Sequence, residues 1–331
     1  MAVIGAGISG LISARTLADH GLRVCVFDKG RGMGGRAATR RADRDMSFDH
    51  GAQYFTVRDP VFSSHVTNWQ SNGVIAEWSS LIVKLQEGSV ENTSPQTRYV
   101  GMPGMSAIGT HLAKGLDIRS ETLIRRISNE STGWKLFDDT GAVFGPYGSI
   151  LIALPAPQAA ELLAPHPFSS IAASVSMAPC WAVMLAFESR FKVPWDGAFV
   201  HGSPLSWITR NSSKPGRPSD RDCWVLHAGP QWSADHLDDA PETVGTQLLN
   251  ALATATGNLL PEVSHLVAHR WRFSMGSSSE MQTAYYDRVT GLAMCGDWLA
   301  GGRIEGAFCS GLAAAMDILG HCGIINNSTH F

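Results

Sequence analysis

The stretch AVIGAGISG at residues 2–10 decides the fold of this chain of 331 residues. Its first three residues predict a short apolar strand, its glycines predict a tight turn, and residues 9–20 predict a helix that Gly21 ends. A second strand is predicted over residues 22–27 and runs directly into Asp28. A strand, a Gly-x-Gly-x-x-Gly turn, a helix and a strand that ends in an acid are typical of a dinucleotide-binding unit.

Each glycine of the turn has its own role in such a unit. Gly5 makes the tight turn, Gly7 lets the backbone approach a pyrophosphate, and Gly10 lets the helix pack closely on the strand. Phosphate is expected at the N-terminus of the helix, where unpaired N–H groups and the helix dipole favour an anion. Asp28 is placed to accept hydrogen bonds from an adenosine ribose. Such turns also occur without a ligand, but the complete order of elements favours cofactor binding.

Composition narrows the class of protein. The chain is 44% hydrophobic and 17% charged, its net charge is −3 and its pI is near 6.4, so it offers no basic field for nucleic acid or an anionic membrane. It contains no run of eighteen uncharged apolar residues, and its first residues lack the basic region of a signal peptide. The six cysteines show no CxxC spacing, which predicts reduced thiols rather than disulfides or a metal site. A cytoplasmic enzyme or binding protein is expected.

Two segments rich in glycine and in polar or charged residues follow the first unit. The segment GRGMGGRAATRR (residues 30–41) predicts a flexible loop that brings Arg36 onto the diphosphate, although a solvated basic loop is the simpler alternative. In FDHGAQYFT (residues 48–56) a Gly-Ala pair lets the backbone pass close to a flat ring, and the alternative is a strand that enters a new sheet. His50 is predicted to be a packed, hydrogen-bonded histidine rather than a base.

The C-terminal block completes the predicted cradle. Residues 291–298 form a buried strand that ends in Gly296-Asp297, and a helix is expected from about residue 307 to residue 319. A carboxylate at the end of such a strand can hold a ribityl or ribose hydroxyl, so Asp297 is a candidate cofactor ligand. Its alternative role is that of a helix cap.

The middle of the chain predicts a second domain inserted into the first. Residues 61–72, 107–114 and 242–256 predict helices, residues 75–85 and 263–273 predict strands, and residues 150–155 predict a strand buried in a parallel sheet. Residues 181–187, 198–200, 206–209 and 223–228 predict one large antiparallel sheet. The polar segment at residues 211–222 is predicted to be an exposed loop.

Several of these stretches carry a resemblance to a known family. The chain resembles the bacterial renalases, within the amine oxidase branch of the glutathione-reductase-like flavoproteins. The similar segments are GRGMGGRAATRR, FDHGAQYFTVRDPVF, RYVGMPGMSAI, WVLHAGPQWS, AHRWRF and GDWLAGGRIEGAFCSG. The resemblance implies an α/β fold in which a Rossmann-like FAD-binding domain carries an inserted, mainly antiparallel α+β substrate domain. The implied bounds are 1–58, 98–156 and 284–325 for the FAD domain, and 59–97 and 157–283 for the substrate domain.

The resemblance also implies a reaction and a set of site residues. The reaction is the oxidation of 2- and 6-dihydro isomers of NAD(P) to NAD(P)+, with FAD as the cofactor and oxygen reduced to hydrogen peroxide. The residues expected to contact FAD are Gly5, Gly7, Ile8, Gly10, Asp28, Lys29, Arg36, Ala52, Gln53, Ile124, Gly296, Asp297 and Ile304. Those expected to face the dinucleotide substrate are Gln53, Tyr54, Phe55, Thr56, Arg98, Tyr99, Val100 and Arg303.

The chemistry of this reaction needs few catalytic groups. A dihydropyridine gains aromaticity when it gives up a hydride, so no general base is expected and the site should work by stacking and orientation. Arg303 is a candidate for binding a carboxamide or a phosphate, and its alternative is an ion pair with Glu305. FAD is expected to be held without a covalent bond, because Cys309, the cysteine nearest the predicted flavin, falls inside a helix.

Two other functions remain open at this point. A flavin amine oxidase would use the same fold with an aromatic pair chosen from Tyr54, Trp181, Trp271 and Trp298. A flavin-binding sensor without catalysis is also compatible with the fold.

Overall fold

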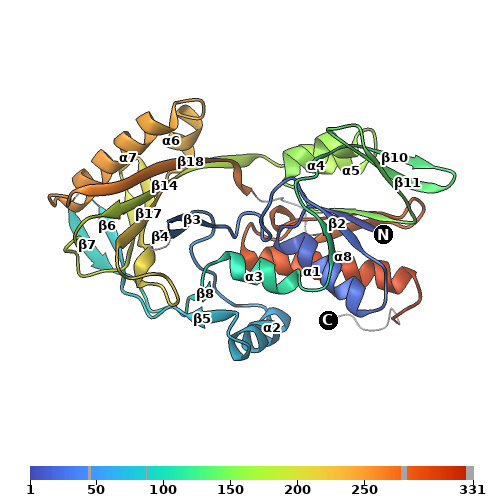
Figure 1. Cartoon of the computed structure of the whole chain (residues 1–331), viewed down its shortest axis with the longest axis horizontal. Helices are drawn as coiled ribbons and strands as arrows, with labels where there is room; N and C mark the ends of the chain where they lie inside the picture. The colour runs from blue at the N-terminus through green and yellow to red at the C-terminus, as the bar shows by residue number, and fades with distance from the viewer. Residues whose placement is uncertain (44–45, 87, 277–281, 326–331) are drawn as a thin grey trace.

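The computed structural model describes residues 1–43, 46–86, 88–276 and 282–325 (Figure 1). The first unit of the chain forms the middle of a six-stranded sheet with the order β19-β20-β13-β1-β2-β9. All neighbours in it run parallel except β19, which pairs antiparallel with β20 at one edge. Its strands are β1 (Ala2–Ile4), β2 (Cys25–Phe27), β9 (Asp117–Arg119), β13 (Ile150–Ile152), β19 (Ala284–Asp287) and β20 (Leu292–Cys295).

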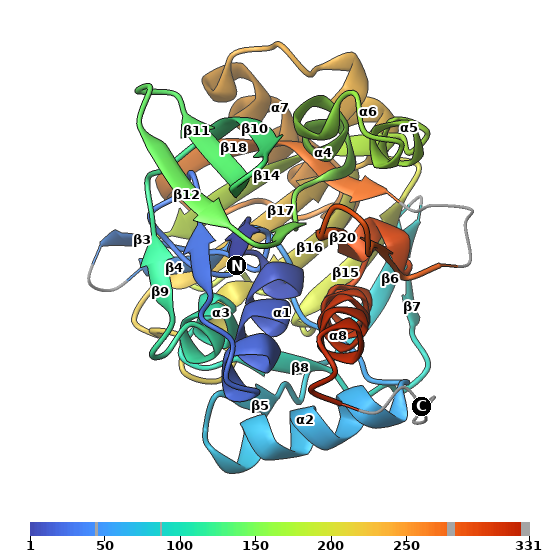
Figure 2. The ribbon, with the colours of Figure 1, turned by 90° about the vertical axis from the view of Figure 1, so that its right-hand side faces the viewer.

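Both faces of this sheet are covered, as continuous apolar strands require. Val3, Val26 and Leu151 face the side that carries α1 (Ile8–Asp19), α3 (Ser106–Leu112) and α8 (Ile304–His321). Figure 2 shows α1 and α8 lying side by side on it. The alternate residues face a three-stranded sheet and two short helices: β10 (Ile124–Glu130), β11 (Gly133–Asp138), β12 (Val143–Tyr147), α4 (Ala156–Leu163) and α5 (Phe168–Ala173). This three-layer arrangement confirms the predicted Rossmann-like fold.

A seven-stranded sheet forms the other lobe, with the order β18-β14-β17-β16-β15-β6-β7. Its pairs are antiparallel except β15 with β6, so the predicted antiparallel sheet is confirmed with one parallel pair added. Its strands are β6 (Ile82–Gln86), β7 (Ser89–Asn92), β14 (Met177–Phe187), β15 (Gly197–His201), β16 (Leu205–Arg210), β17 (Asp222–Ala228) and β18 (Val263–Gly276). Figure 1 shows α6 (Pro230–Asp235) and α7 (Pro241–Thr256) packed along it, where Leu248 and Leu252 meet Trp224 and Leu226.

The remaining elements are short. They are α2 (Pro60–Ser71), the pair β5 (Ile75–Glu77) and β8 (Tyr99–Gly101), the hairpin β3 (Thr39–Asp43) and β4 (Met46–Asp49), and 3-10 turns at Asn211–Ser213 and Asp297–Leu299. The prediction of one strand over residues 75–85 is wrong. Ile75 and Trp78 are buried in the core beside the parallel sheet, whereas Val83 and Leu85 are buried in the core of the seven-stranded sheet. The chain therefore turns between them and contributes to two sheets.

The prediction that residues 211–222 form an exposed loop is also wrong. Asn211 is fully buried, and the side chains of Lys214 and Arg217 have no exposed surface. These two cations are buried because both contact the carboxylate of Asp49 at the end of β4. Within the described ranges, no helix is both long enough and apolar enough to cross a bilayer. All six cysteines are free.

Candidate active site

A cavity of about 1150 Å³ lies between the two large sheets. On one side its wall is formed where β1, β2, β13 and β20 end, by residues such as Gly5, Asp28, Ala153 and Gly296. On the other side β14, β16, β17 and β18 contribute the wall. The carboxyl ends of parallel strands are the usual ligand site of this kind of sheet. At this size the cavity is larger than a pocket for a single drug-sized ligand.

The glycines of the first turn have the distinct environments that the sequence predicts. Gly5 has φ +109°, which L side chains rarely adopt, and a Cβ on it would overlap the carbonyl oxygen of Ala153. A Cβ on Gly10 would overlap the carbonyl oxygen of Gly5, so α1 packs directly against the turn. A Cβ on Gly7 would meet no protein atom within 4 Å. Gly7 therefore borders open space in the cavity, which a ligand can occupy.

The turn and the start of α1 form an anion site. No described residue accepts a hydrogen bond from the backbone N–H groups of Ile8, Ser9 and Gly10, and Gly7 caps the helix without a side-chain bond. These donors carry the positive end of a helix of 12 residues. The Asp28 carboxylate holds the turn in place, because it accepts hydrogen bonds from Ala6 N at 2.6 Å and Gly30 N at 2.7 Å.

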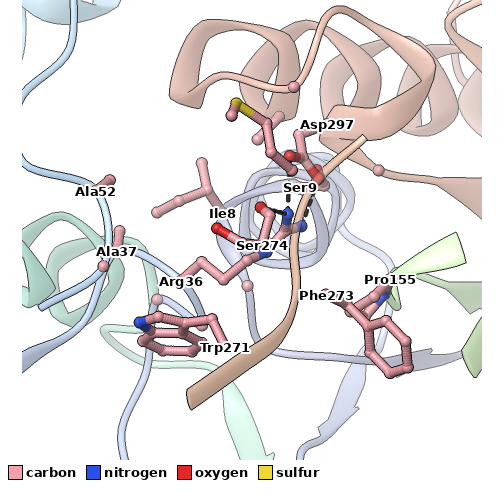
Figure 3. Close-up of a pocket in the computed structure, with 18 of the residues that line it drawn as sticks. Ile8, Ser9, Arg36, Ala37, Ala52, Pro155, Trp271, Phe273, Ser274 and Asp297 are labelled. Carbon is pink, nitrogen blue, oxygen red and sulfur yellow. Dashed lines mark hydrogen bonds and ion pairs between the residues drawn. The ribbon is translucent and has the colours of Figure 1, made fainter. Parts of the chain in front are cut away.

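Arg36 and Asp297, predicted to bind different parts of the cofactor, contact each other. The guanidinium donates to Asp297 Oδ2 at 3.1 Å and also to Oδ1, and it reaches the carbonyl oxygen of Ser274 at 2.9 Å (Figure 3). This pair joins the glycine loop to the end of β20 and to β18. It places a cation and a carboxylate next to each other beside the start of α1.

Residues 49–53 form a rigid platform on the cavity floor. The carbonyl oxygen of His50 accepts hydrogen bonds from Trp271 Nε1 at 2.9 Å and from His227 at 3.2 Å. A Cβ on Gly51 would overlap the carbonyl oxygen of Arg36, so this position requires glycine. The Gln53 amide group donates to the carbonyl oxygens of Asp49 and Gly51. The platform is thus held by Gln53 from within and by Trp271 and His227 from the seven-stranded sheet.

A buried charge cluster supports this platform from below. Lys214 Nζ donates to Asp49 Oδ2 at 3.2 Å, to Gln53 Oε1 at 3.0 Å and to Asn211 Oδ1 at 3.2 Å, which uses all three of its protons. Arg217 adds two further bonds to Asp49. Burial opposes the charge on Asp49, but Lys214 and Arg217 hold the pKa of this carboxyl below its usual value. Burial lowers the pKa of Lys214 to about 8.

Most of the predicted site residues lie around one cavity. Every predicted cofactor residue except Gly10 lines it, and Gly10 packs behind the turn. Of the predicted substrate residues, those lining it are Gln53, Tyr54, Phe55, Thr56 and Arg303. Arg98, Tyr99 and Val100 lie one layer behind, where the Arg98 guanidinium stacks 5.2 Å from the Tyr54 ring centre and Tyr99 pairs with the Phe55 backbone.

Two further expectations differ from the geometry. Glu305 accepts hydrogen bonds from the backbone N–H groups of Arg58 and Asp59, and no described ion pair joins it to Arg303. Cys309 does not line the cavity, whereas Cys180 does. Burial raises the pKa of Cys180 to about 12, so its thiol is not a nucleophile at neutral pH.

Sequence reasoning missed the wall contributed by the seven-stranded sheet. The residues concerned include Phe199, Ser206, Trp207, His227 and His269. Trp271 of the same wall was predicted only as a candidate for the aromatic pair of an amine oxidase. His227 and Trp271 fall inside WVLHAGPQWS and AHRWRF, two of the stretches that carried the resemblance. Those motifs were the available signal, but strand periodicity alone does not say which face of a strand meets a cavity.

The comparisons with known proteins agree with this geometry. Residues 64–319 match the sequence profile of the flavin containing amine oxidoreductases, and residues 3–68 match that of the NAD(P)-binding Rossmann-like domains. The fold and the site thus define a flavin-dependent oxidoreductase with a Rossmann-like dinucleotide cradle. The chain belongs to the flavin containing amine oxidoreductase family, and its cofactor is FAD.

Solved structures show the same fold at low identity. A protein of Exiguobacterium sp. 255-15 assigned as a protoporphyrinogen oxidase superposes with a TM-score of 0.79 at 13% identity, over 96% of this chain and 98% of that one. Cyclohexylamine oxidase from Brevibacterium oxydans IH-35A gives 0.77 at 14%, over 97% and 99%. A putrescine oxidase bound to putrescine gives 0.75 at 14%, over 96% and 98%.

The residues present fit FAD. The open space above Gly7 and the unpaired N–H groups of α1 suit a diphosphate, and Asp28 lies at the end of β2 where the ribose of such cofactors binds. When bound, FAD supplies a ring that takes up two electrons from a substrate. Gly51, Ala52 and the indole of Trp271 line the cavity and would offer flat surfaces to that ring.

Two buried histidines predict how stability changes with pH. Burial lowers the pKa of His50 from 6.5 to about 4, with His269 as a second cause, and burial lowers that of His227 to about 4. The unfolded chain then binds more protons than the folded protein between pH 6.5 and 4, so the free energy of unfolding should fall as the pH drops through this window. Each shift contributes on the order of 3 kcal/mol.

Urea unfolding of the FAD-saturated protein at pH 7 and pH 4.5 measures this effect. His50→Phe keeps a ring against Trp271 and removes one of the two groups, so its stability should depend less on pH. An unchanged dependence in His50→Phe would show that other groups cause the loss.

Proposed function

We propose that this protein is a renalase-type oxidase that converts 2- and 6-dihydro isomers of NAD(P) to NAD(P)+. A hydride leaves the dihydropyridine carbon with its electron pair, the flavin is reduced, and oxygen then takes the two electrons and two protons to give hydrogen peroxide. FAD is held without a covalent bond. The protein's own residues bind and orient the dinucleotide and exclude water from the reacting rings.

The charge of the cavity lining carries this proposal. The lining contains seven cationic residues and three carboxylates; the cations are Lys29, Arg36, Arg58, Arg125, Arg270, Arg272 and Arg303, and the carboxylates are Asp28, Glu161 and Asp297. Two of the carboxylates are already bound, Asp28 by backbone N–H groups and Asp297 by Arg36. An anionic dinucleotide fits such a lining, whereas an aliphatic amine is cationic at neutral pH and would be repelled.

The position of the free cations agrees with an anionic substrate. Arg58 and Arg303 both line the cavity where α8 begins, because the Arg58 backbone N–H donates to Glu305 in the first turn of α8 and Arg303 directly precedes that helix. Neither side chain has an ion pair among the described residues. Other parts of the lining are aromatic: the Trp207 ring meets Tyr54 in a tilted arrangement and Phe199 edge-on, with ring centroids 5.5 Å and 4.7 Å apart. Phosphates near the arginines and a dihydropyridine between the aromatic walls match this division.

Anaerobic mixing tests the proposal. The 2- and 6-dihydro isomers should bleach the flavin within seconds, while putrescine and cyclohexylamine leave it oxidised. Ordinary 4-dihydro NADH should react about a hundredfold more slowly, because placing C2 or C6 for reaction displaces C4 by an ångström or more. Admitting oxygen should restore the flavin colour and produce peroxide. Rapid reduction by an amine, with no response to the isomers, would favour amine oxidation, and no reduction by any donor would favour a sensor.

Arg303 separates substrate binding from cofactor binding. Arg303→Ala should keep the flavin and lower kcat/KM by about ten- to a hundredfold, since one charge-assisted hydrogen bond is lost. Arg221→Ala is the matched control, because Arg221 pairs with Glu188 on the surface and does not line the cavity. Flavin content and steady-state kinetics of both variants show whether Arg303 binds the substrate or the cofactor. Flavin loss in Arg303→Ala would place this residue at the cofactor.

A further inference from the structure

His227 lies on the cavity wall in a position that the function described above does not use. In β17, Trp224 and Leu226 face the core beneath α7, and the alternate residues Cys223 and Val225 face Phe48 of β4. His227 continues the second row, because side chains alternate along a strand. It reaches the cavity directly above the platform at residues 49–53.

The hydrogen bonds of His227 fix which ring nitrogen carries the proton. Its Nε2 lies 3.2 Å from the carbonyl oxygen of His50, which only accepts, so Nε2 is the donor. Lys214 only donates, so Gln53 Oε1 faces Lys214 and the Gln53 NH2 group lies on the other side, 3.4 Å from His227 Nε2. Both protons of this NH2 group are accepted by the carbonyl oxygens of Asp49 and Gly51, so Gln53 does not donate to His227. The neutral ring therefore has Nδ1 as an acceptor, and no described residue donates to it.

The surroundings of His227 keep the ring neutral. Burial lowers its pKa to about 4, and the nearby charge of Lys214 acts in the same direction. Because all three protons of Lys214 are engaged by Asp49, Gln53 and Asn211, the lysine contributes a fixed charge rather than a donor to the cavity. Most charged residues of the cavity lining are cations, which only donate hydrogen bonds, whereas His227 presents a neutral acceptor.

We propose that His227 Nδ1 accepts a hydrogen bond from the carboxamide NH2 of the substrate and thereby sets the orientation of the dihydropyridine ring. This assignment rests on the proposed function. The phosphates have no N–H donor and suit the arginines, whereas the carboxamide is the N–H donor carried by the ring that reacts. His227 lines the cavity beside Trp271, since the two side chains share the carbonyl oxygen of His50 as their hydrogen-bond partner. Arg303 then binds a phosphate of the substrate rather than its carboxamide.

Two variants separate the acceptor from the bond that holds the platform. His227→Gln can place its NH2 group where Nε2 lies, which keeps the donor to His50 and removes the Nδ1 acceptor. His227→Asn can place its carbonyl oxygen where Nδ1 lies, which keeps the acceptor and removes the donor to His50. His265→Gln is the control, because His265 stacks on Phe48 and does not line the cavity.

The substrate probe is the pair of 2- and 6-dihydro isomers made from NAD and from its 3-acetylpyridine analogue, in which a methyl group replaces the NH2. The unchanged protein and His265→Gln should prefer the carboxamide by about tenfold in kcat/KM, because the analogue leaves a buried acceptor unpaired. In His227→Gln the preference should fall below twofold, with flavin content unchanged, and His227→Asn should retain part of it. Titration of the flavin spectrum with NAD+ and its analogue should show the same pattern in Kd.

A tenfold preference that persists in His227→Gln would overturn the assignment of the carboxamide to His227. Failure of the unchanged protein to react with either carboxamide isomer would instead overturn the proposed function, and this assignment with it.

Discussion

Asp49→Asn is expected to lower the free energy of unfolding by about 3–5 kcal/mol, because it leaves two buried cations without their carboxylate. The Lys214 and Arg217 side chains have no exposed surface, and Asp49 is the only acid that contacts either of them among the described residues. Asparagine has the same shape, so the change is electrostatic. The platform at residues 49–53 should loosen as well, since Lys214, which pairs with the Asp49 carboxylate, donates a hydrogen bond to Gln53 Oε1.

Asp238→Asn provides the matched control. The Asp238 side chain is 81% exposed and contacts Arg270 and Arg272, so its removal should cost less than about 1 kcal/mol. Urea unfolding of both variants, with FAD in excess, measures the two values. Equal, small losses in both would mean that the buried cluster is not held by charge.

Gly7→Ala is expected to weaken FAD binding and Gly10→Ala to lower the stability of the apoprotein, although each adds one methyl group. The methyl on Gly7 projects into open space, so the apoprotein should be as stable as before while the Kd for FAD rises by about a hundredfold or more. The methyl on Gly10 overlaps the carbonyl oxygen of Gly5, so α1 must move away from the turn. Overpacking of this kind costs about 1–3 kcal/mol, and the apoprotein itself should be destabilised.

Thermal unfolding without flavin and FAD titration separate the two effects. Gly148→Ala is a neutral control, since its methyl also meets no atom within 4 Å and it lies outside the lining of the cavity. FAD binding to Gly7→Ala with unchanged Kd would show that the cofactor does not pass close to the turn.

At 13–14% identity, the comparisons with solved structures establish the architecture and leave the substrate open. Under the proposed function, the excess of arginine in the cavity lining favours a substrate with phosphates over a cationic amine. The same scaffold can therefore serve either class of substrate through changes in the residues that line one cavity.

The sequence by itself determined the FAD cradle. Gly5, Gly7, Gly10 and Asp28 lie within one contiguous unit, and the requirement for glycine at each position depends on neighbours only a few residues away or on the adjoining strand. The position of Asp297 at the carboxyl end of β20 was predictable for a related reason. A buried strand that ends in Gly-Asp before a helix is typical of a cofactor site in such a sheet. These patterns lie within short segments of sequence, so they can be recognised without knowledge of the tertiary structure.

The opposite wall of the cavity and the charge cluster beneath its floor depend on contacts between distant parts of the chain. Residues 211–217 are polar and contain proline and glycine, so hydropathy predicts an exposed loop, yet Lys214 and Arg217 are buried against Asp49 from a distant part of the chain. In the same way, Arg98 lies behind Tyr54 and His227 faces the cavity because of how two sheets meet. A charged side chain is buried only where an opposite charge and hydrogen-bond partners meet it, and folding alone brings those partners together.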